Sequence, residues 1–149
     1  MVTLADKYAA QVLELVNAER AKEDLPALKA SDALNKAANI RAKELVTENS
    51  PNRPDGRNGC SVLTDEKIVY ETAGENIAGN SSNSGAVKAW MNSSGHKANI
   101  FWNLAGYQVS VYGSYQRHYI CGQHGYTWIE QSKSARLGAG RRWKGYKHI

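Results

Sequence analysis

The strongest constraint on the fold of this chain is a change in the spacing of its apolar residues. Between Leu4 and Leu45 they recur at helical spacing in two stretches, and Pro26 separates the two predicted helices. From Tyr107 to Ile129 apolar and polar residues alternate, which predicts β-strands. Helices followed by strands that pair as an antiparallel sheet form the α+β class, so we predict an α+β fold.

The middle of the chain follows neither pattern. Prolines and glycines are frequent over residues 48–70, which predicts a long irregular loop there. A strand-like segment follows at residues 74–77, and the polar turn at residues 80–85 can cap a third helix. Gly95 is expected to end that helix, and residues 96–102 can form one more helical turn. A long loop inside a compact domain is often functional, so this region is where we look for a site.

The strand region is predicted to hold a hairpin. Residues 107–113, 118–121 and 126–129 read as strands, and the intervening GSYQR at residues 113–117 has the length of a hairpin turn. We find no internal repeat. We predict a single domain over residues 1–131.

The net charge of +5 comes from the end of the chain. Residues 132–149 contain six basic and no acidic side chains, whereas the preceding residues contain 13 basic and 14 acidic ones. The body therefore has no basic excess, which argues against a nucleic-acid partner. The basic C-terminal tail, residues 132–149, is interpreted either as a solvated terminus or as a segment that touches anionic polymers.

Membrane insertion and secretion are judged from apolar runs. No run approaches the roughly 20 apolar residues that a membrane span needs. The N-terminus does not have the pattern of a signal peptide, so if the protein is secreted we expect its signal to lie outside this sequence.

The two cysteines leave two alternatives open. Cys60 and Cys121 are too far apart in sequence for a CxxC metal or redox motif. They form either one long-range disulfide, in an oxidising compartment, or two separately buried thiols.

Motifs for nucleophilic catalysis and phosphate binding are absent. The sequence has neither a G-x-S-x-G elbow nor a phosphate-binding glycine loop. No two histidines have the i, i+4 spacing of a zinc-binding helix, although His118 and His124 would share one face of a single strand. Spacing alone therefore does not predict a metal site, and His96 is only a weak candidate ligand.

Glu75 and His96 are the candidate pair for chemistry. Glu75 is a carboxylate inside a short apolar segment, where it should be paired or have a raised pKa. His96 lies where a helix is predicted to end. Such a pair could serve acid–base catalysis or ligand binding, or it could simply tie a loop to a helix.

The motifs around these residues resemble the core signature of the CAP superfamily, in its bacterial SCP-like extracellular branch. The resemblance is carried by Gly74–Ile77 and Ala89–Ile100, supported by the loop Arg53–Arg57 and the helix Leu34–Leu45. It runs from about residue 8 to about residue 125. It implies an α–β–α sandwich, with helices on both sides of a small antiparallel sheet and one open cleft.

The resemblance also implies a set of cleft residues. Members of the family commonly line the cleft with two histidines and two acidic residues, and some bind zinc there. Glu75 and His96 match one of each, whereas Pro51 and Ser93 stand where the other histidine and acid would be. Since proline offers no metal-binding atom, too few ligands remain for stable zinc unless a strand histidine contributes.

We therefore expect no cofactor and a degenerate His/Glu site. Glu75 and His96 are predicted to form a hydrogen-bonded pair at the floor of the cleft, with Asn76, Ser93 and Asn52 as further cleft residues.

Three functions are compatible with these observations. The first is a secreted, non-catalytic and monomeric CAP domain whose cleft binds an extracellular lipid, peptide or cell-wall component. The second is a peptidase-like hydrolase that uses Glu75 and His96, which would be weak machinery without a metal or a nucleophile. The third is a structural or immune-modulatory antigen recognised through its loops. We expect the first, and the peptidase-like hydrolase stays open as the alternative.

Overall fold

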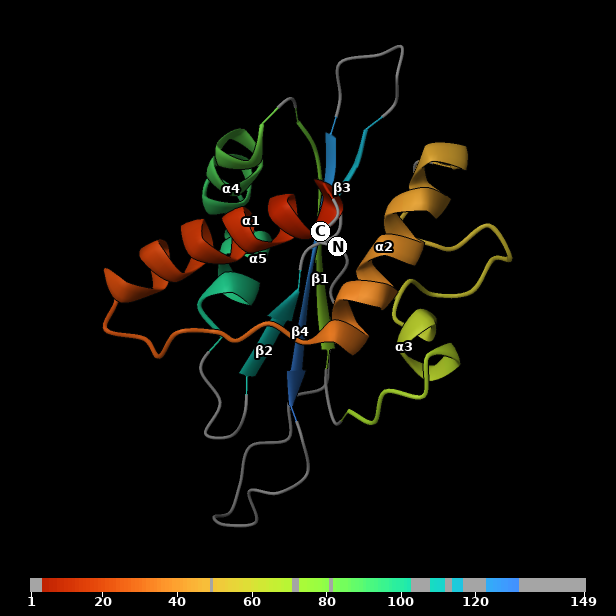
Figure 1. The fold of residues 1–149 in the computed structure, drawn as a ribbon, viewed down its shortest axis with the longest axis horizontal. Coiled ribbons are helices and arrows are strands. Elements are labelled where there is room, and N and C mark those ends of the chain that lie inside the picture. Colours follow the sequence, from red (N-terminus) through yellow and green to blue (C-terminus); the bar gives the residue numbers. More distant parts are fainter. Residues whose placement is uncertain are drawn as a thin grey trace.

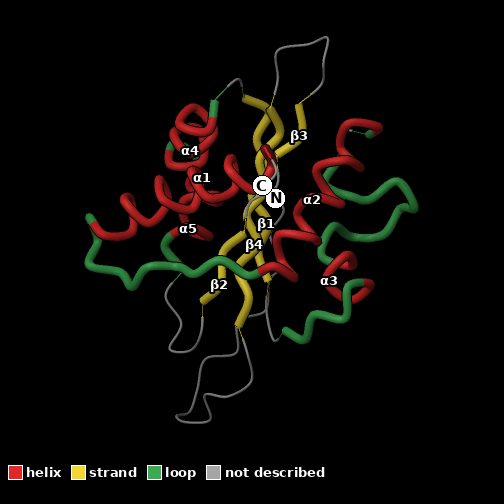
Figure 2. The backbone as a smooth tube through the Cα atoms, in the orientation of Figure 1, coloured by secondary structure: helices red, strands yellow, loops and turns green. Residues whose placement is uncertain are grey.

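The computed structural model describes residues 4–48, 50–70, 73–80, 82–102, 108–111, 114–116 and 123–131. Helices lie on both sides of a central sheet (Figure 1), and the layers are clear when the backbone is coloured by secondary structure (Figure 2). The elements in chain order are α1 (Leu4–Ala21), α2 (Asp32–Thr47), α3 (Ser61–Asp65), β1 (Ala73–Asn80), α4 (Asn83–Met91), α5 (Ser94–Ile100), β2 (Gln108–Val111), β3 (Ser114–Gln116) and β4 (Gln123–Gln131). The predicted α+β class and α–β–α sandwich are confirmed.

The sheet is built around β4, which pairs antiparallel with every other described strand. Its order is β1-β4-β2, and β3 also pairs with β4. In the β1–β4 ladder Ala73 lies opposite Glu130 and Asn80 lies opposite Gln123. The strand that carries Glu75 is therefore held along its whole length by a strand from the end of the described chain.

Each side of the sheet has its own hydrophobic core. One core joins α2 and α3, and the partly buried Ala73 and Ile77 of β1 pack against it. The other joins α1, α4 and α5, and Ala78 of β1 packs against that one. Odd-numbered residues of β1 therefore face α2, and even-numbered residues face α4 and α5, as strand alternation requires.

The helix boundaries follow from local chemistry. The side chain of Ser31 accepts a hydrogen bond from the backbone N–H of Leu34 and caps α2. Ser82 accepts from the N–H of Gly85 and caps α4. α1 ends at Ala21, five residues before Pro26, where the predicted helix was to stop.

Three predictions of local structure are wrong. The loop over residues 48–70 contains the helix α3, because Val62 and Leu63 are fully buried against the small residues of α2. Gly95 does not end the third helix: the break comes at Ser93, whose extended backbone starts α5, so Gly95 lies inside α5. GSYQR is not a hairpin turn, since it contains β3.

Two further predictions lie outside what is described. The predicted strand at residues 118–121 and the basic tail at residues 132–149 both fall there. Across the described helices, none combines the length and apolarity needed to cross a membrane.

Candidate functional site

The candidate residues of β1 lie on opposite faces of the sheet. Glu75 and Asn76 are consecutive in the strand, so their side chains point in opposite directions. Glu75 contacts Arg41 of α2, whereas Asn76 contacts His96 of α5. The structure therefore contains two polar clusters, one on each side of β1.

The first cluster is centred on Arg41, whose side chain is fully buried in α2. Its Nε donates to Oε1 of Glu75 at 3.1 Å, and the Glu75 side chain is only 6% exposed. Its guanidinium also donates to Glu44 at 2.8 Å and to the backbone carbonyl of Pro51 at 3.1 Å. Arg41 thus ties β1, α2 and the following loop together.

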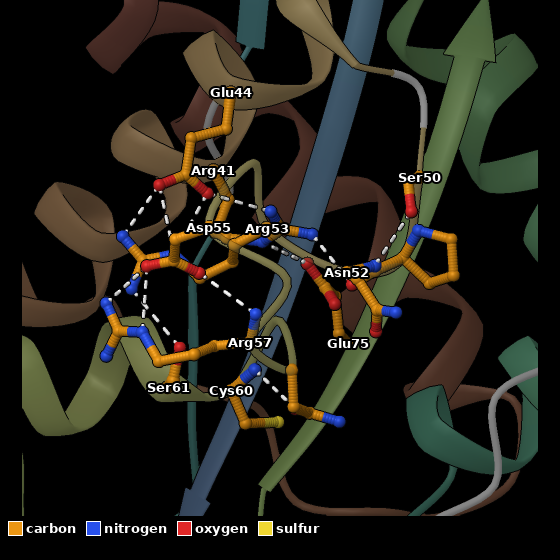
Figure 3. Close-up of polar contacts among 12 residues, drawn as sticks. Arg41, Glu44, Ser50, Asn52, Arg53, Asp55, Arg57, Cys60, Ser61 and Glu75 are labelled. Carbon is orange, nitrogen blue, oxygen red and sulfur yellow. Dashed lines mark hydrogen bonds and ion pairs between the residues drawn. The ribbon is translucent and has the colours of Figure 1, made fainter.

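Arg53 extends this cluster across the loop (Figure 3). It donates to Glu44, with a shortest distance of 2.6 Å, and it also pairs with Asp65 at the end of α3. Arg57 makes a further ion pair with Asp65. We call the set of Arg41, Glu44, Arg53, Asp65 and Glu75 the arginine network.

The two central carboxylates of the network differ in acidity. Burial would raise the pKa of Glu44, but the hydrogen bonds and charges of Arg53 and Arg41 together outweigh it, so the pKa of Glu44 is lowered. For Glu75, burial is the dominant influence and raises its pKa, although Arg41 opposes it. Glu75 is therefore more weakly acidic than an exposed carboxylate.

Gly59 closes the arginine network from the loop side. A Cβ at this position would collide with Oε2 of Glu75, and it would lie 3.0 Å from the carbonyl oxygen of Pro51. Only a residue without a side chain lets the loop come this close to the carboxylate.

The second cluster joins β1 to α5 and consists of Asn76, His96 and Asn99. Asn76 is fully buried. Its Oδ1 lies 2.9 Å from Nδ1 of His96, and its Nδ2 donates to the backbone carbonyl of His96 at 3.1 Å. Asn99 Nδ2 donates to Asn76 Oδ1 at 2.9 Å. We call these three residues the His96 cluster.

The predicted Glu75–His96 hydrogen bond is wrong. Glu75 instead accepts a hydrogen bond from Arg41 and His96 bonds to Asn76, on opposite sides of the sheet. Strand alternation is the reason, because the residue of β1 that faces α5 is Asn76. The acid and base that a paired hydrolase would need are therefore separated by the sheet itself.

The remaining predicted residues are divided between the two sides. Ser93 is half-buried at the start of α5, three residues before His96, and its side chain makes no capping hydrogen bond. Asn52 is exposed in the loop beside Pro51, on the side of the arginine network. Cys60 is buried in the α2 core. Cys121 lies outside the described residues, so the alternatives of bridge and separate thiols both remain predictions.

The donor atoms that are described do not fit a zinc site. Zinc needs three or four convergent ligands. Within the described residues no group of three His, Cys, Asp or Glu side chains converges. Glu75 is held by Arg41, and Nδ1 of His96 is held by Asn76. His118 and the side chain of His124 lie outside the described parts, and the expectation of no cofactor stays a prediction.

Five residues of these clusters were missed by the sequence reasoning: Arg41, Glu44, Arg53, Asp65 and Asn99. For Arg41 a signal exists, because it lies in register with Leu34, Ala37 and Ala38 on the apolar face of α2. An arginine at a core position requires a buried partner, which would have pointed to a carboxylate such as Glu75. Nothing in the local sequence indicates the partners of Arg53 and Asn99, which depend on tertiary contacts.

Comparison with known protein families identifies one family. The sequence pattern of the cysteine-rich secretory protein (CAP) family matches residues 13–129. The chain is 38% identical over 96 residues to the protein YkwD of Bacillus subtilis (strain 168), a match that covers 62% of this chain and 37% of YkwD.

Solved structures show the same fold. An extracellular protein containing an SCP domain from Bacillus anthracis superposes with a TM-score of 0.75 at 23% identity, over 87% of this chain and 42% of that one. An outer surface protein from Borrelia burgdorferi gives a TM-score of 0.72 at 16% identity, over 88% of this chain and 97% of that one. The chain thus spans less than half the length of YkwD and of the Bacillus anthracis protein. On the family match, which covers most of its length, the chain belongs to the CAP (cysteine-rich secretory protein) family.

Proposed function

We propose that this protein is a secreted, non-catalytic CAP domain that binds an extracellular ligand at the His96 side of the sheet. The observation that carries the proposal is the separation of Glu75 from His96. Arg41 neutralises the Glu75 carboxylate on the opposite face, so Glu75 is not available to act with His96 as an acid–base pair.

His96 supplies the binding group. Its ring is half-buried, and its Nδ1 is held by Asn76, while no partner for Nε2 is found in the part of the chain that is described. A ring that is fixed at one nitrogen offers the other to a ligand at little cost in side-chain entropy.

A polar ligand is favoured over a lipid. In the described residues Val69 is the exposed large hydrophobic side chain, and it is a single residue, not a patch. We therefore place a cell-wall glycan or a peptide ahead of a lipid as the ligand. Secretion is supported by the two structural relatives that are described as an extracellular and an outer surface protein.

A three-armed binding assay tests the proposal. The chain is mixed with purified cell-wall sacculi, with a peptide array and with phospholipid vesicles, and bound protein is quantified. We expect saturable binding to the sacculi or to peptides. His96→Gln is expected to weaken it about tenfold, the loss of roughly one hydrogen bond, whereas Asn92→Ala, at an exposed residue, should not change it.

The same samples separate binding from catalysis. Mass spectrometry of the bound material should show intact peptide and glycan after prolonged incubation. Cleavage products that disappear in Glu75→Gln would overturn the non-catalytic reading. Binding in no arm, or binding that His96→Gln leaves unchanged, would overturn the proposed site.

A further inference from the structure

The orientation of the Asn76 amide is fixed by a backbone carbonyl. The carbonyl oxygen of His96 can only accept a hydrogen bond, so the atom of Asn76 that lies 3.1 Å from it must be the nitrogen, Nδ2. The other amide atom, Oδ1, therefore faces Nδ1 of His96 at 2.9 Å. Because Oδ1 can only accept, Nδ1 must carry a proton.

Asn99 leads independently to the same assignment. Its Nδ2 lies 3.4 Å from the backbone carbonyl of Glu75 and 2.9 Å from Oδ1 of Asn76. The carbonyl of Glu75 requires a donor, so the Asn99 atom is nitrogen and the Asn76 atom that it meets is an acceptor. Asn76 is fully buried, so water does not compete for its amide. The backbone carbonyls of His96 and Glu75 thus fix the amide orientation of Asn76, and that orientation fixes the tautomer of His96.

We propose that Asn76, supported by Asn99, is a positioning residue that holds His96 in the Nδ1–H tautomer and so presents Nε2 as a hydrogen-bond acceptor. The ligand class follows from this, and this part rests on the proposed function: the ligand binds through an N–H or O–H donor, as the hydroxyls of a glycan or the amides of a peptide would provide. A carboxylate or phosphate oxygen, which only accepts, does not suit a neutral Nε2.

Burial of the ring favours the same state. It lowers the pKa of His96, so the neutral imidazole is the main form near neutral pH. A neutral imidazole has a proton on one nitrogen and a lone pair on the other. The contact with Asn76 places the proton on Nδ1 and leaves the lone pair on Nε2.

The tautomer can be measured without any ligand. The full chain is labelled with 15N-histidine, and the imidazole nitrogens of His96 are observed by two-bond 15N–1H correlation at neutral pH. We expect a pyrrole-type shift for Nδ1 and a pyridine-type shift for Nε2. This is the reverse of the Nε2–H form that an unconstrained histidine favours in water. The reverse pattern, or a charged ring, would overturn the positioning role, and this result needs no variant.

Variants of Asn76 then test the cause. Asn76→Leu removes the acceptor, so the Nε2–H form should become the main tautomer. Asn76→Asp loses the donor to the His96 carbonyl but keeps the oxygen that faces Nδ1, so it should keep the proton on Nδ1. If Asn76 merely filled space, Asn76→Asp and Asn76→Leu would show the same tautomer. Asn92→Ala is the matched control and should leave the spectrum unchanged. An unchanged tautomer in a folded Asn76→Leu protein would refute the assignment.

The ligand chemistry is tested with soluble cell-wall glycan fragments in native and permethylated form. Native fragments should shift the Nε2 signal, and permethylated fragments, which have lost their N–H and O–H donors, should not. Equal shifts from both would refute donor recognition. If the expected tautomer is found but neither sacculi nor peptides bind, the proposed function and its ligand class fail while the positioning role stands.

Discussion

Removal of Arg41 should destabilise this protein far more than neutralisation of its partner Glu75. The Arg41 side chain is fully buried and that of Glu75 is 6% exposed, so the pair is a buried ion pair. Removing one member of such a pair leaves an uncompensated buried charge, which typically costs about 3–5 kcal/mol. That is a large part of the roughly 5–15 kcal/mol by which a domain is usually stable.

The two substitutions differ in what they leave behind. In Arg41→Met the carboxylates of Glu75 and Glu44 both lose a donor. In Glu75→Gln the amide oxygen can still accept from Arg41, whose charge remains paired with Glu44. We therefore expect Glu75→Gln to cost only about 1 kcal/mol. The free energy of unfolding is obtained from urea titrations of both variants and the wild type.

The loss of stability caused by Arg41→Met should increase with pH. Burial raises the pKa of Glu75, so the folded protein holds this proton more tightly than the unfolded chain does. The stability that Glu75 contributes is therefore complete below its unfolded pKa and is lost as the pH rises through its folded pKa. Without Arg41 to oppose burial the pKa rises further, so the stability gap between wild type and Arg41→Met should widen from pH 4 to pH 7. Glu44 acts in the same direction, since Arg41 helps to lower its pKa.

A double-mutant cycle gives the decisive comparison. In a Glu75→Gln background Arg41→Met should cost less, because the buried charge at residue 75 is gone. Two results would refute the reasoning: a gap between wild type and Arg41→Met that is equal at pH 4 and pH 7, or a cost of Glu75→Gln that equals that of Arg41→Met.

Three further substitutions, two of them with a matched control substitution, probe packing, capping and a buried cation, each by urea or thermal unfolding. Gly59→Ala should cost about 1–3 kcal/mol because its methyl group would collide with the Glu75 carboxylate. Its control, Gly56→Ala, has open space around the added methyl group but a φ of +80°, and should cost only about 1 kcal/mol. Equal costs would show that backbone strain, and not the contact with Glu75, determines the loss of stability. Ser82→Ala should cost about 1 kcal/mol by loss of a helix cap, and Ser93→Ala, whose side chain makes no cap bond, should be near neutral. Arg20→Met should cost about 3 kcal/mol or more, since the buried guanidinium donates to three backbone carbonyls; a cost under 1 kcal/mol would contradict that.

The sequence predicted the class of the fold because its periods are local properties. Helical spacing located α1 and α2, and alternation located the strand region. The short helix α3 was missed because five residues have no measurable period, and its burial against α2 is a tertiary effect.

The sequence analysis named some residues of the two polar clusters but not the pairing within them. Glu75, Asn76 and His96 all belong to the polar clusters that the structure shows. The error was to join Glu75 to His96, although alternation in β1 already requires adjacent residues to face opposite sides. The role of Arg41 could also have been found, from its place on the apolar face of α2.

The two cores differ in how far apart along the chain their members lie. The α2 core is built from residues 34–63, with β1 adjoining it soon after. The α1 core joins residues 9–28 to residues 86–100, and Arg20 reaches the carbonyl of Ile100, 80 positions later. Closing the longer loop costs more chain entropy and slows folding. The α2 side can thus condense early around a short stretch of chain, whereas α1 can bury its apolar face only after α4 and α5, which follow much later in the chain, have formed.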